Sequence, residues 1–168
     1  MRQAECLPRA LHHFSWAEIA GLADLLRDRL AGARIAGVVG IARSGLVPAV
    51  MLSHMLDVRP FAVLDIVRTS SDAVEAEKSR PASRGDLGLE NLRGRRVLLI
   101  DDIVGQGLTL EAARRILIAA DIDPVTAVLV VNRANLAGRE ACDIVDHWAC
   151  EVHGWVVFPW EGKDPGDA

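Results

Sequence analysis

The sequence predicts an α/β protein whose sheet is mostly parallel and flanked by helices. Short apolar, β-branched runs alternate along the chain with longer segments of helical periodicity, and most connections between them are short. The apolar runs show no polar alternation, which is typical of strands buried on both faces of a parallel sheet. The 168 residues fit one domain, 1–168, large enough to bury a substantial core.

The first half of the chain supplies two helices and two strands. A capping box, with Ser15 as N-cap and Glu18 three residues later, predicts the start of the first helix. Apolar residues then recur at helical spacing as far as Leu30. A buried strand is expected over residues 35–42, and the turn ARSG then leads into a helix with Pro48 in its first turn.

The second half repeats this alternation. Further strands are expected over residues 61–67, 95–100, 125–131 and 143–149, and a second strongly periodic helix over residues 109–120. The segment 68–94 is polar and charged, with little periodicity. A segment of this length without a core pattern is usually a functional lid or a disordered loop, and a short helical piece around 73–78 is a further alternative.

Composition sets limits on function. The formal net charge of −4 argues against a dedicated nucleic-acid binder, so no nucleic-acid partner is expected. The three cysteines are odd in number and lack CxxC spacing, as in proteins of a reducing compartment. The N-terminus lacks the apolar stretch of a signal peptide, and no apolar run approaches the length of a membrane span. We therefore expect a cytoplasmic protein without a membrane partner.

The stretch RRVLLIDDIVGQGLTL combines an acidic pair with a glycine-containing loop. Asp101 and Asp102 come at the carboxyl end of a predicted parallel strand, where ligands bind in such sheets. Gly105 and Gly107 permit positive φ, so that successive backbone N–H groups can face an anion. Thr109 begins a helix whose N-terminal amides favour a phosphate. The residues alone leave a second interpretation open, a strand that ends in an aspartate-capped turn without a ligand.

The run VLLIDDIVGQGLTL resembles the phosphoribosyl-pyrophosphate (PRPP) signature of the type I phosphoribosyltransferases. GIARSGLVPAVMLSHML is similar to the pyrophosphate loop and following helix of the bacterial xanthine-guanine phosphoribosyltransferases, and GWVVFPWE is similar to their C-terminal base-binding segment. The resemblance covers most of the chain. It implies the single-domain type I phosphoribosyltransferase fold, with a flexible hood over residues 68–93 and a base-binding segment over residues 147–161.

The resemblance implies roles for the residues around the reacting sugar. Asp101 and Asp102 would hold the ribose hydroxyls of PRPP, with Asp102 also near a Mg²⁺ ion that the substrate carries. Arg43, together with the backbone of Ser44 and Gly45, would bind the pyrophosphate and stabilise it as it leaves. For Arg43, an exposed arginine beside a helix is the alternative without a ligand.

It also implies roles at the two ends of the nucleotide. The 5′-phosphate would lie in a backbone cradle made by Gly105, Gln106, Gly107, Leu108 and Thr109. The base would stack on Trp155, with the Val156 backbone, Asn132 and Arg133 at its edge. For Trp155, a core aromatic without a ligand is the alternative. Gln106 stands where the family usually has threonine, which leaves the backbone cradle intact.

Two departures from the pattern of the 6-oxopurine enzymes fall on base recognition. In those enzymes an aspartate stands at the position of Gly105 and handles the N7 proton of the base, and a lysine stands at the position of Asn132 and donates to O6. Gly105 cannot act as a general base. Adenine- and orotate-specific relatives also lack the aspartate, so the resemblance leaves the acceptor base open.

The function implied by the resemblance is Mg²⁺-dependent transfer of a 5-phosphoribosyl group from PRPP to a nitrogenous base, a purine or purine-like compound, with release of pyrophosphate. The expected partners are PRPP and that base, and the assembly of relatives implies a homodimer or homotetramer. The two departures motivate an alternative, a non-catalytic sensor of PRPP or nucleotides on the same fold.

Overall fold

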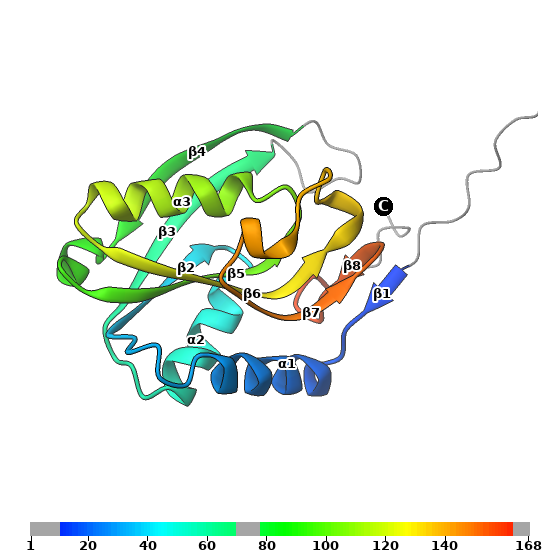
Figure 1. Ribbon diagram of the computed structural model, residues 1–168, viewed down its shortest axis with the longest axis horizontal. Helices are drawn as coiled ribbons and strands as arrows, with labels where there is room; N and C mark the ends of the chain where they lie inside the picture. The colour runs from blue at the N-terminus through cyan, green and yellow to red at the C-terminus, as the bar shows by residue number, and fades with distance from the viewer. Residues whose placement is uncertain (1–10, 70–77, 163–168) are drawn as a thin grey trace, which may run out of the picture.

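The computed structural model describes residues 11–69 and 78–162 (Figure 1). Its strands are β1 (Leu11–His13), β2 (Gly37–Ala42), β3 (Phe61–Thr69), β4 (Lys78–Leu87), β5 (Arg96–Val104), β6 (Asp123–Asn132), β7 (His147–Val152) and β8 (Trp155–Val157). Its helices are α1 (Trp16–Arg29), α2 (Leu46–Met55) and α3 (Leu108–Ala119), with short 3-10 helices η1 (Leu89–Leu92), η2 (Arg133–Asn135) and η3 (Ala141–Asp143). The alternation of strands and helices predicted from the sequence is confirmed.

A six-stranded sheet in the order β4-β3-β2-β5-β6-β7 forms the middle layer. Its neighbouring strands are parallel, except that β4 runs antiparallel to β3 at one edge. Helices α1 and α2 cover one face and α3 covers the other (Figure 1). A separate parallel pair, β1 and β8, joins the two ends of the described chain. The predicted class, a mostly parallel sheet flanked by helices, is confirmed.

Strand β5 shows why the sequence of the central strands is continuously apolar. Leu98 and Ile100 pack against α1 and α2, whereas Val97 and Leu99 pack under α3. All four side chains are fully buried. Successive residues of a strand point to opposite faces, so a strand covered on both sides must be apolar at every position.

The N-terminus of α1 begins as its capping box predicts. The Ser15 hydroxyl accepts a hydrogen bond from the Glu18 amide at 3.3 Å, and the Glu18 carboxylate accepts one from the Ser15 amide at 2.7 Å. This reciprocal pair satisfies amides that no helical carbonyl can reach.

Part of the polar segment 68–94 is a strand, which corrects the prediction of a loop. Residues 78–87 form β4, and the described side chains from Ser83 to Leu87 are exposed at the edge of the sheet. An edge strand of this kind has no buried face and therefore no apolar pattern. The helical alternative around 73–78 lies largely outside the described residues, and Lys78 begins β4.

The strand expected over 143–149 begins later than predicted. η3 ends at Asp143 and β7 starts only at His147. The reason lies in Asp146, whose carboxylate accepts hydrogen bonds from the amide and hydroxyl of Thr126 at 2.8 and 2.7 Å. These side-chain bonds fix the entry to β7 and take the place of ladder bonds before it.

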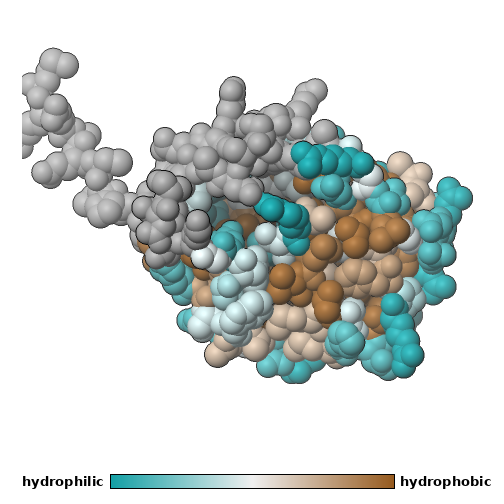
Figure 2. Space-filling view, turned by 180° about the vertical axis from the view of Figure 1, so that it is seen from behind, coloured by the Kyte–Doolittle hydropathy of each residue, from teal (hydrophilic) through white to brown (hydrophobic). Residues whose placement is uncertain are grey.

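Figure 2 shows apolar side chains gathered in the middle of the face seen from behind. The exposed large apolar side chains of the described residues are Leu11, Trp16, Leu25, Val50, Leu87, Leu108 and Ile118, which belong to five different elements. No helix in the described ranges is long and apolar enough to span a membrane.

Candidate active site

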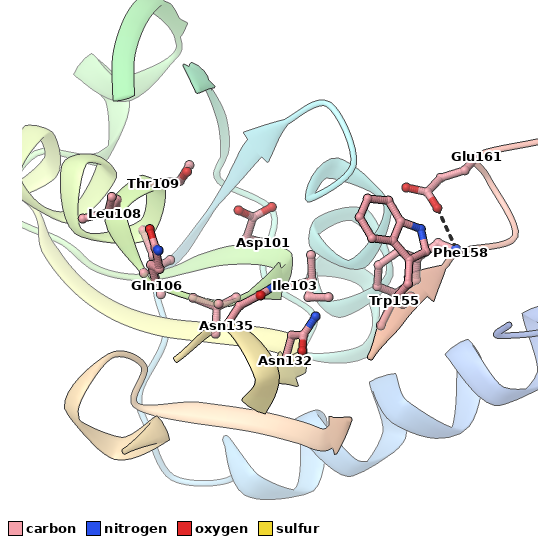
Figure 3. A pocket seen from close by; sticks show the side chains of 15 residues that line it. Asp101, Ile103, Gln106, Leu108, Thr109, Asn132, Asn135, Trp155, Phe158 and Glu161 are labelled. Carbon is pink, nitrogen blue, oxygen red and sulfur yellow. Dashed lines mark hydrogen bonds between the residues drawn. The ribbon is translucent and has the colours of Figure 1, made fainter. Parts of the chain in front are cut away.

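A pocket of about 310 Å³ opens at the carboxyl ends of β5 and β6 (Figure 3). It is lined by Asp101, Ile103, Val104, Gly105, Gln106, Gly107, Leu108, Thr109, Leu110, Asn132, Asn135, Trp155, Val156, Phe158 and Glu161. The location is the one at which parallel sheets bind ligands. The lining joins three chain segments, the loop from β5 to α3, the end of β6 and the C-terminal segment.

The loop from β5 to α3 is shaped by two glycines. Gly107 has φ of +79°, and a Cβ added to it would lie 2.4 Å from Cγ2 of Ile144. A Cβ added at Gly105 would lie 2.7 Å from the Cβ of Asn135. No described side chain caps α3, and its first residues line the pocket, so its first amides are available to an anion bound there. The loop therefore has the geometry of an anion cradle.

Arg139 braces this loop from the connection between β6 and β7. Its Nη1 donates to the Gln106 carbonyl at 3.4 Å, and its Nη2 donates to the Asp143 carbonyl at 2.9 Å. The guanidinium thus ties the loop to η3 and brings a positive charge beside it. Sequence reasoning missed this brace, because Arg139 lies in a polar connection with no motif.

Replacing Arg139 by alanine is expected to weaken binding of PRPP, the ligand that the resemblance implies, about three- to tenfold, since each lost hydrogen bond contributes on the order of 1 kcal/mol. Titration calorimetry with PRPP and Mg²⁺ measures the effect. Arg114→Ala, on the surface of α3 away from the pocket, is the matched control. Equal affinities in the two variants would contradict a bracing role for Arg139.

The acidic pair lies at the end of β5. Oδ1 of Asp101 accepts from the Asp102 amide at 3.0 Å, and Oδ1 of Asp102 accepts from the Ile103 amide at 2.8 Å. Asp101 lines the pocket, whereas Asp102 is only 7% exposed and lies outside its lining.

Burial perturbs the protonation of both carboxyl groups. It raises the pKa of Asp101 from 3.8 to about 6, against the opposing effect of hydrogen bonds from Asp102. Burial, and then the neighbouring charge of Asp101, raise the pKa of Asp102 well above its usual range. Such perturbed carboxyl groups in a cleft are a mark of functional sites.

The turn from β2 to α2 contacts the acidic pair through Gly45. A Cβ added there would lie 2.6 Å from the Ile41 carbonyl oxygen and 2.8 Å from Oδ1 of Asp101. The peptide bond between Ala42 and Arg43 is cis. The structure thus brings the predicted pyrophosphate turn beside Asp101, although Arg43 and Ser44 lie outside the lining of the pocket.

The C-terminal segment forms the opposite wall. Trp155 and Val156 line the pocket as the resemblance implied, and Phe158 and Glu161 lie with them. The Glu161 carboxylate accepts from the Phe158 amide at 2.9 Å, which holds the segment in a turn (Figure 3). Nothing in the sequence indicates that Glu161 lines the pocket, because an acidic residue near the end of a chain is ordinarily solvated.

The two residues expected at the base edge differ in their placement. Asn132 lines the pocket, but its Nδ2 donates to the Gly154 carbonyl at 2.7 Å and its Oδ1 accepts from the Ala134 amide at 3.1 Å. Arg133 lies outside the lining, with Nη1 donating to Glu151 at 2.6 Å. Asn132 therefore positions the segment before Trp155, and Arg133 forms a surface ion pair.

An acidic pair, a glycine-containing loop and an aromatic wall lie together at one edge of a parallel sheet, where such sheets bind ligands. Sequence comparison is more specific, because the model of the phosphoribosyl transferase domain matches residues 12–163. The chain belongs to this family. The predicted family, the type I phosphoribosyltransferases, is confirmed.

Relatives with different acceptor bases match this chain. The xanthine-guanine phosphoribosyltransferase of Cereibacter sphaeroides is 30% identical over 89% of this chain and 86% of its own length. The adenine phosphoribosyltransferase of Mycobacterium tuberculosis is 31% identical over 73% of this chain and 59% of its own length. The crystal structure of a purine phosphoribosyltransferase from Pyrococcus horikoshii superposes with a TM-score of 0.74 at 26% identity, over 92% of this chain and 95% of that one. Identity alone therefore does not decide the base.

Proposed function

We propose that this chain transfers the 5-phosphoribosyl group of PRPP to a ring nitrogen of a purine or purine-like base and releases pyrophosphate. The observation that carries the proposal is that Asp101, the loop 105–109 and Trp155 line one pocket (Figure 3). These features match the three parts of the product, a ribose, a 5′-phosphate and a base. Membership of the family narrows the reaction to phosphoribosyl transfer.

The binding mode follows from the lining. The 5′-phosphate would accept hydrogen bonds from the amides of the loop 105–109 at the start of α3 and from the Thr109 hydroxyl. Asp101, which faces the pocket, would accept from a ribose hydroxyl, with Asp102 behind it. The pyrophosphate would then lie toward Arg43 and the turn at Gly45, which contacts Asp101.

The reaction needs charge stabilisation and alignment more than covalent catalysis. The bond from the base nitrogen to C1 of the ribose forms as the bond from C1 to the pyrophosphate oxygen breaks, with its electron pair leaving on the pyrophosphate. The base gives up one ring N–H proton to solvent, so that the base in the product nucleotide is neutral. Positive charge develops on the sugar near Asp101, and negative charge on the leaving group near Arg43. The stacked base is held for attack by the Trp155 wall.

Mg²⁺ is proposed to enter with PRPP. The residues in the described ranges contain no group of three or more histidine, cysteine, aspartate or glutamate side chains that could hold a metal. Mg²⁺ usually takes one or two protein carboxylates and completes its shell with substrate phosphates and water. Asp101 would supply such a carboxylate from the pocket side, whereas Asp102, the residue expected near the ion, lies behind it outside the lining. The ion would offset the charge of the pyrophosphate.

Incubation with PRPP, Mg²⁺ and a panel of purines is expected to release pyrophosphate with at least one base. Removing Mg²⁺ with EDTA is expected to abolish the release, and added Mg²⁺ to restore it, because the substrate enters as its magnesium complex. A coupled pyrophosphate assay measures both. If no base supports release, catalysis is excluded, and if EDTA has no effect, the role of Mg²⁺ is excluded.

A second candidate function, nucleotide sensing without turnover, is favoured by one observation. Neither Gly105 nor the hydrogen-bonded amide of Asn132 offers a general base beside the ring. Calorimetry distinguishes the two functions, because tight binding of PRPP or a nucleotide without pyrophosphate release would identify a sensor.

The proposal also includes the homodimeric or homotetrameric assembly and the cytoplasmic location expected from the sequence. Light scattering tests the assembly.

A further inference from the structure

Asn135 occupies the space that a side chain at position 105 would need. A Cβ at Gly105 would lie 2.7 Å from the Cβ of Asn135, 3.6 Å from its carbonyl oxygen and 3.7 Å from its Cγ. Any residue larger than glycine at position 105 would therefore displace Asn135. The Asn135 side chain of η2 therefore fills the space that a side chain at position 105 of the β5–α3 loop would take.

The carboxamide of Asn135 differs from that of Asn132, the other asparagine in the pocket lining. Both polar groups of Asn132 are engaged, with Gly154 and Ala134. Asn135 lines the pocket, and its carboxamide makes no hydrogen bond within the described part of the chain. Figure 3 shows its side chain in the region between Gln106 and Asn132. Asn135 thus presents a donor and an acceptor, side by side, to a ligand.

A carboxamide complements one kind of purine edge. In an adenine nucleotide, whose N7 carries no proton, the edge with N7 and the 6-amino group offers an acceptor beside a donor, to which asparagine makes a bidentate pair. The same edge of a 6-oxopurine nucleotide offers two acceptors, N7 and O6, so one carbonyl would face another. Asn132 cannot supply a compensating donor for O6, because its amino group is bonded to Gly154.

We propose that Asn135 determines base specificity and selects a 6-aminopurine over a 6-oxopurine. The inference rests on the proposed phosphoribosyl transfer, since it places the base in the same pocket. It assigns the recognition to a residue of η2 that lies outside the three sequence motifs of the PRPP, pyrophosphate and base segments.

The test compares bases within each variant, which a merely structural effect would not change. The kcat/KM values for adenine, hypoxanthine and guanine, and the Kd values for AMP and IMP, are measured for the wild type, Asn135→Ala and Asn135→Asp. The wild type is expected to prefer adenine and AMP. Asn135→Ala is expected to lower the ratio of AMP affinity to IMP affinity about ten- to hundredfold, the discrimination that a bidentate pair provides. The adenine-to-hypoxanthine ratio of kcat/KM is expected to fall in the same direction, because N7 loses its proton on the way to the product.

Asn135→Asp keeps the shape of the side chain but removes its donor, so a carboxylate would face N7. The AMP affinity of this variant is therefore expected to fall at least as far as that of Asn135→Ala. Asn91→Ala, an exposed asparagine of η1 outside the pocket, is the matched control and is expected to keep the wild-type ratio. Thermal unfolding of each variant verifies that the fold is intact.

The outcomes separate this inference from the function on which it rests. Pyrophosphate release with an unchanged base ratio in Asn135→Ala, or a wild type that prefers hypoxanthine or guanine, overturns the assignment to Asn135 alone. If no base is used, the AMP-to-IMP ratio of Kd values decides the assignment by itself. Absence of both turnover and nucleotide binding overturns the proposed function together with the inference.

Discussion

Asp101→Asn is expected to lower phosphoribosyl transfer at least about a hundredfold and, at neutral pH, to stabilise the folded protein. The loss of activity follows from removing the carboxylate that faces the developing positive charge of the sugar. The gain in stability follows from the burial that raises the pKa of Asp101 from 3.8 to about 6. One substitution should therefore move activity and stability in opposite directions.

The sign of the pH dependence distinguishes this mechanism from general stabilisation. Between the unfolded pKa of 3.8 and the folded pKa of about 6, the folded chain binds more protons at Asp101 than the unfolded chain. The free energy of unfolding of the wild type therefore falls as the pH rises through this window. Asparagine does not ionise, so the advantage of the variant is absent below about pH 4 and complete above about pH 6.

Urea unfolding at pH 4 and pH 7.5 measures both ends of this window, and pyrophosphate release measures activity. The matched control is Asp86→Asn, an exposed carboxylate on β4 outside the pocket lining, for which activity and stability should stay near wild type. An equal change in stability at the two pH values would show that Asp101 is not held as a buried carboxyl in the folded state.

The sequence predicts the central strands because burial on both faces leaves a pattern in every residue. Val97 to Ile100 are apolar at each position and are fully buried. β4 escapes prediction because an edge strand needs no apolar face. The three-residue strands β1 and β8 are too short to carry a pattern, and they depend on pairing with each other across the chain.

The same distinction applies to the candidate site. Asp101 and the loop 105–109 belong to one contiguous stretch whose geometry is local, and the structure places them together in the pocket. Asn135 and Arg139 follow β6 in the chain and contact that loop, which follows β5. Their contacts therefore exist only after β6 has folded beside β5. The orientation of Arg133, toward Glu151 rather than the pocket, is likewise a product of tertiary packing.

Gly45→Ala is expected to lower transfer about a hundredfold or more and to destabilise the protein by about 1–3 kcal/mol. The new methyl group would lie 2.6 Å from the Ile41 carbonyl oxygen and 2.9 Å from Cα of Asp101. Both are backbone atoms of buried strands, so neither can move aside without displacing the sheet. Pyrophosphate release and urea unfolding measure the two effects.

Gly21→Ala is the control for the added methyl group itself. Gly21 lies within α1, and a Cβ there would meet no atom within 4 Å. Alanine at this position is expected to raise stability by about 0.5–1 kcal/mol and to leave transfer unchanged.

Because Gly45 joins the pyrophosphate turn to Asp101, the damage of Gly45→Ala should fall on kcat and on the KM for PRPP. The KM for the base should change little, since Gly45 lies outside the pocket lining to which Trp155 and Val156 belong. A variant with wild-type kcat would show that the two segments act independently.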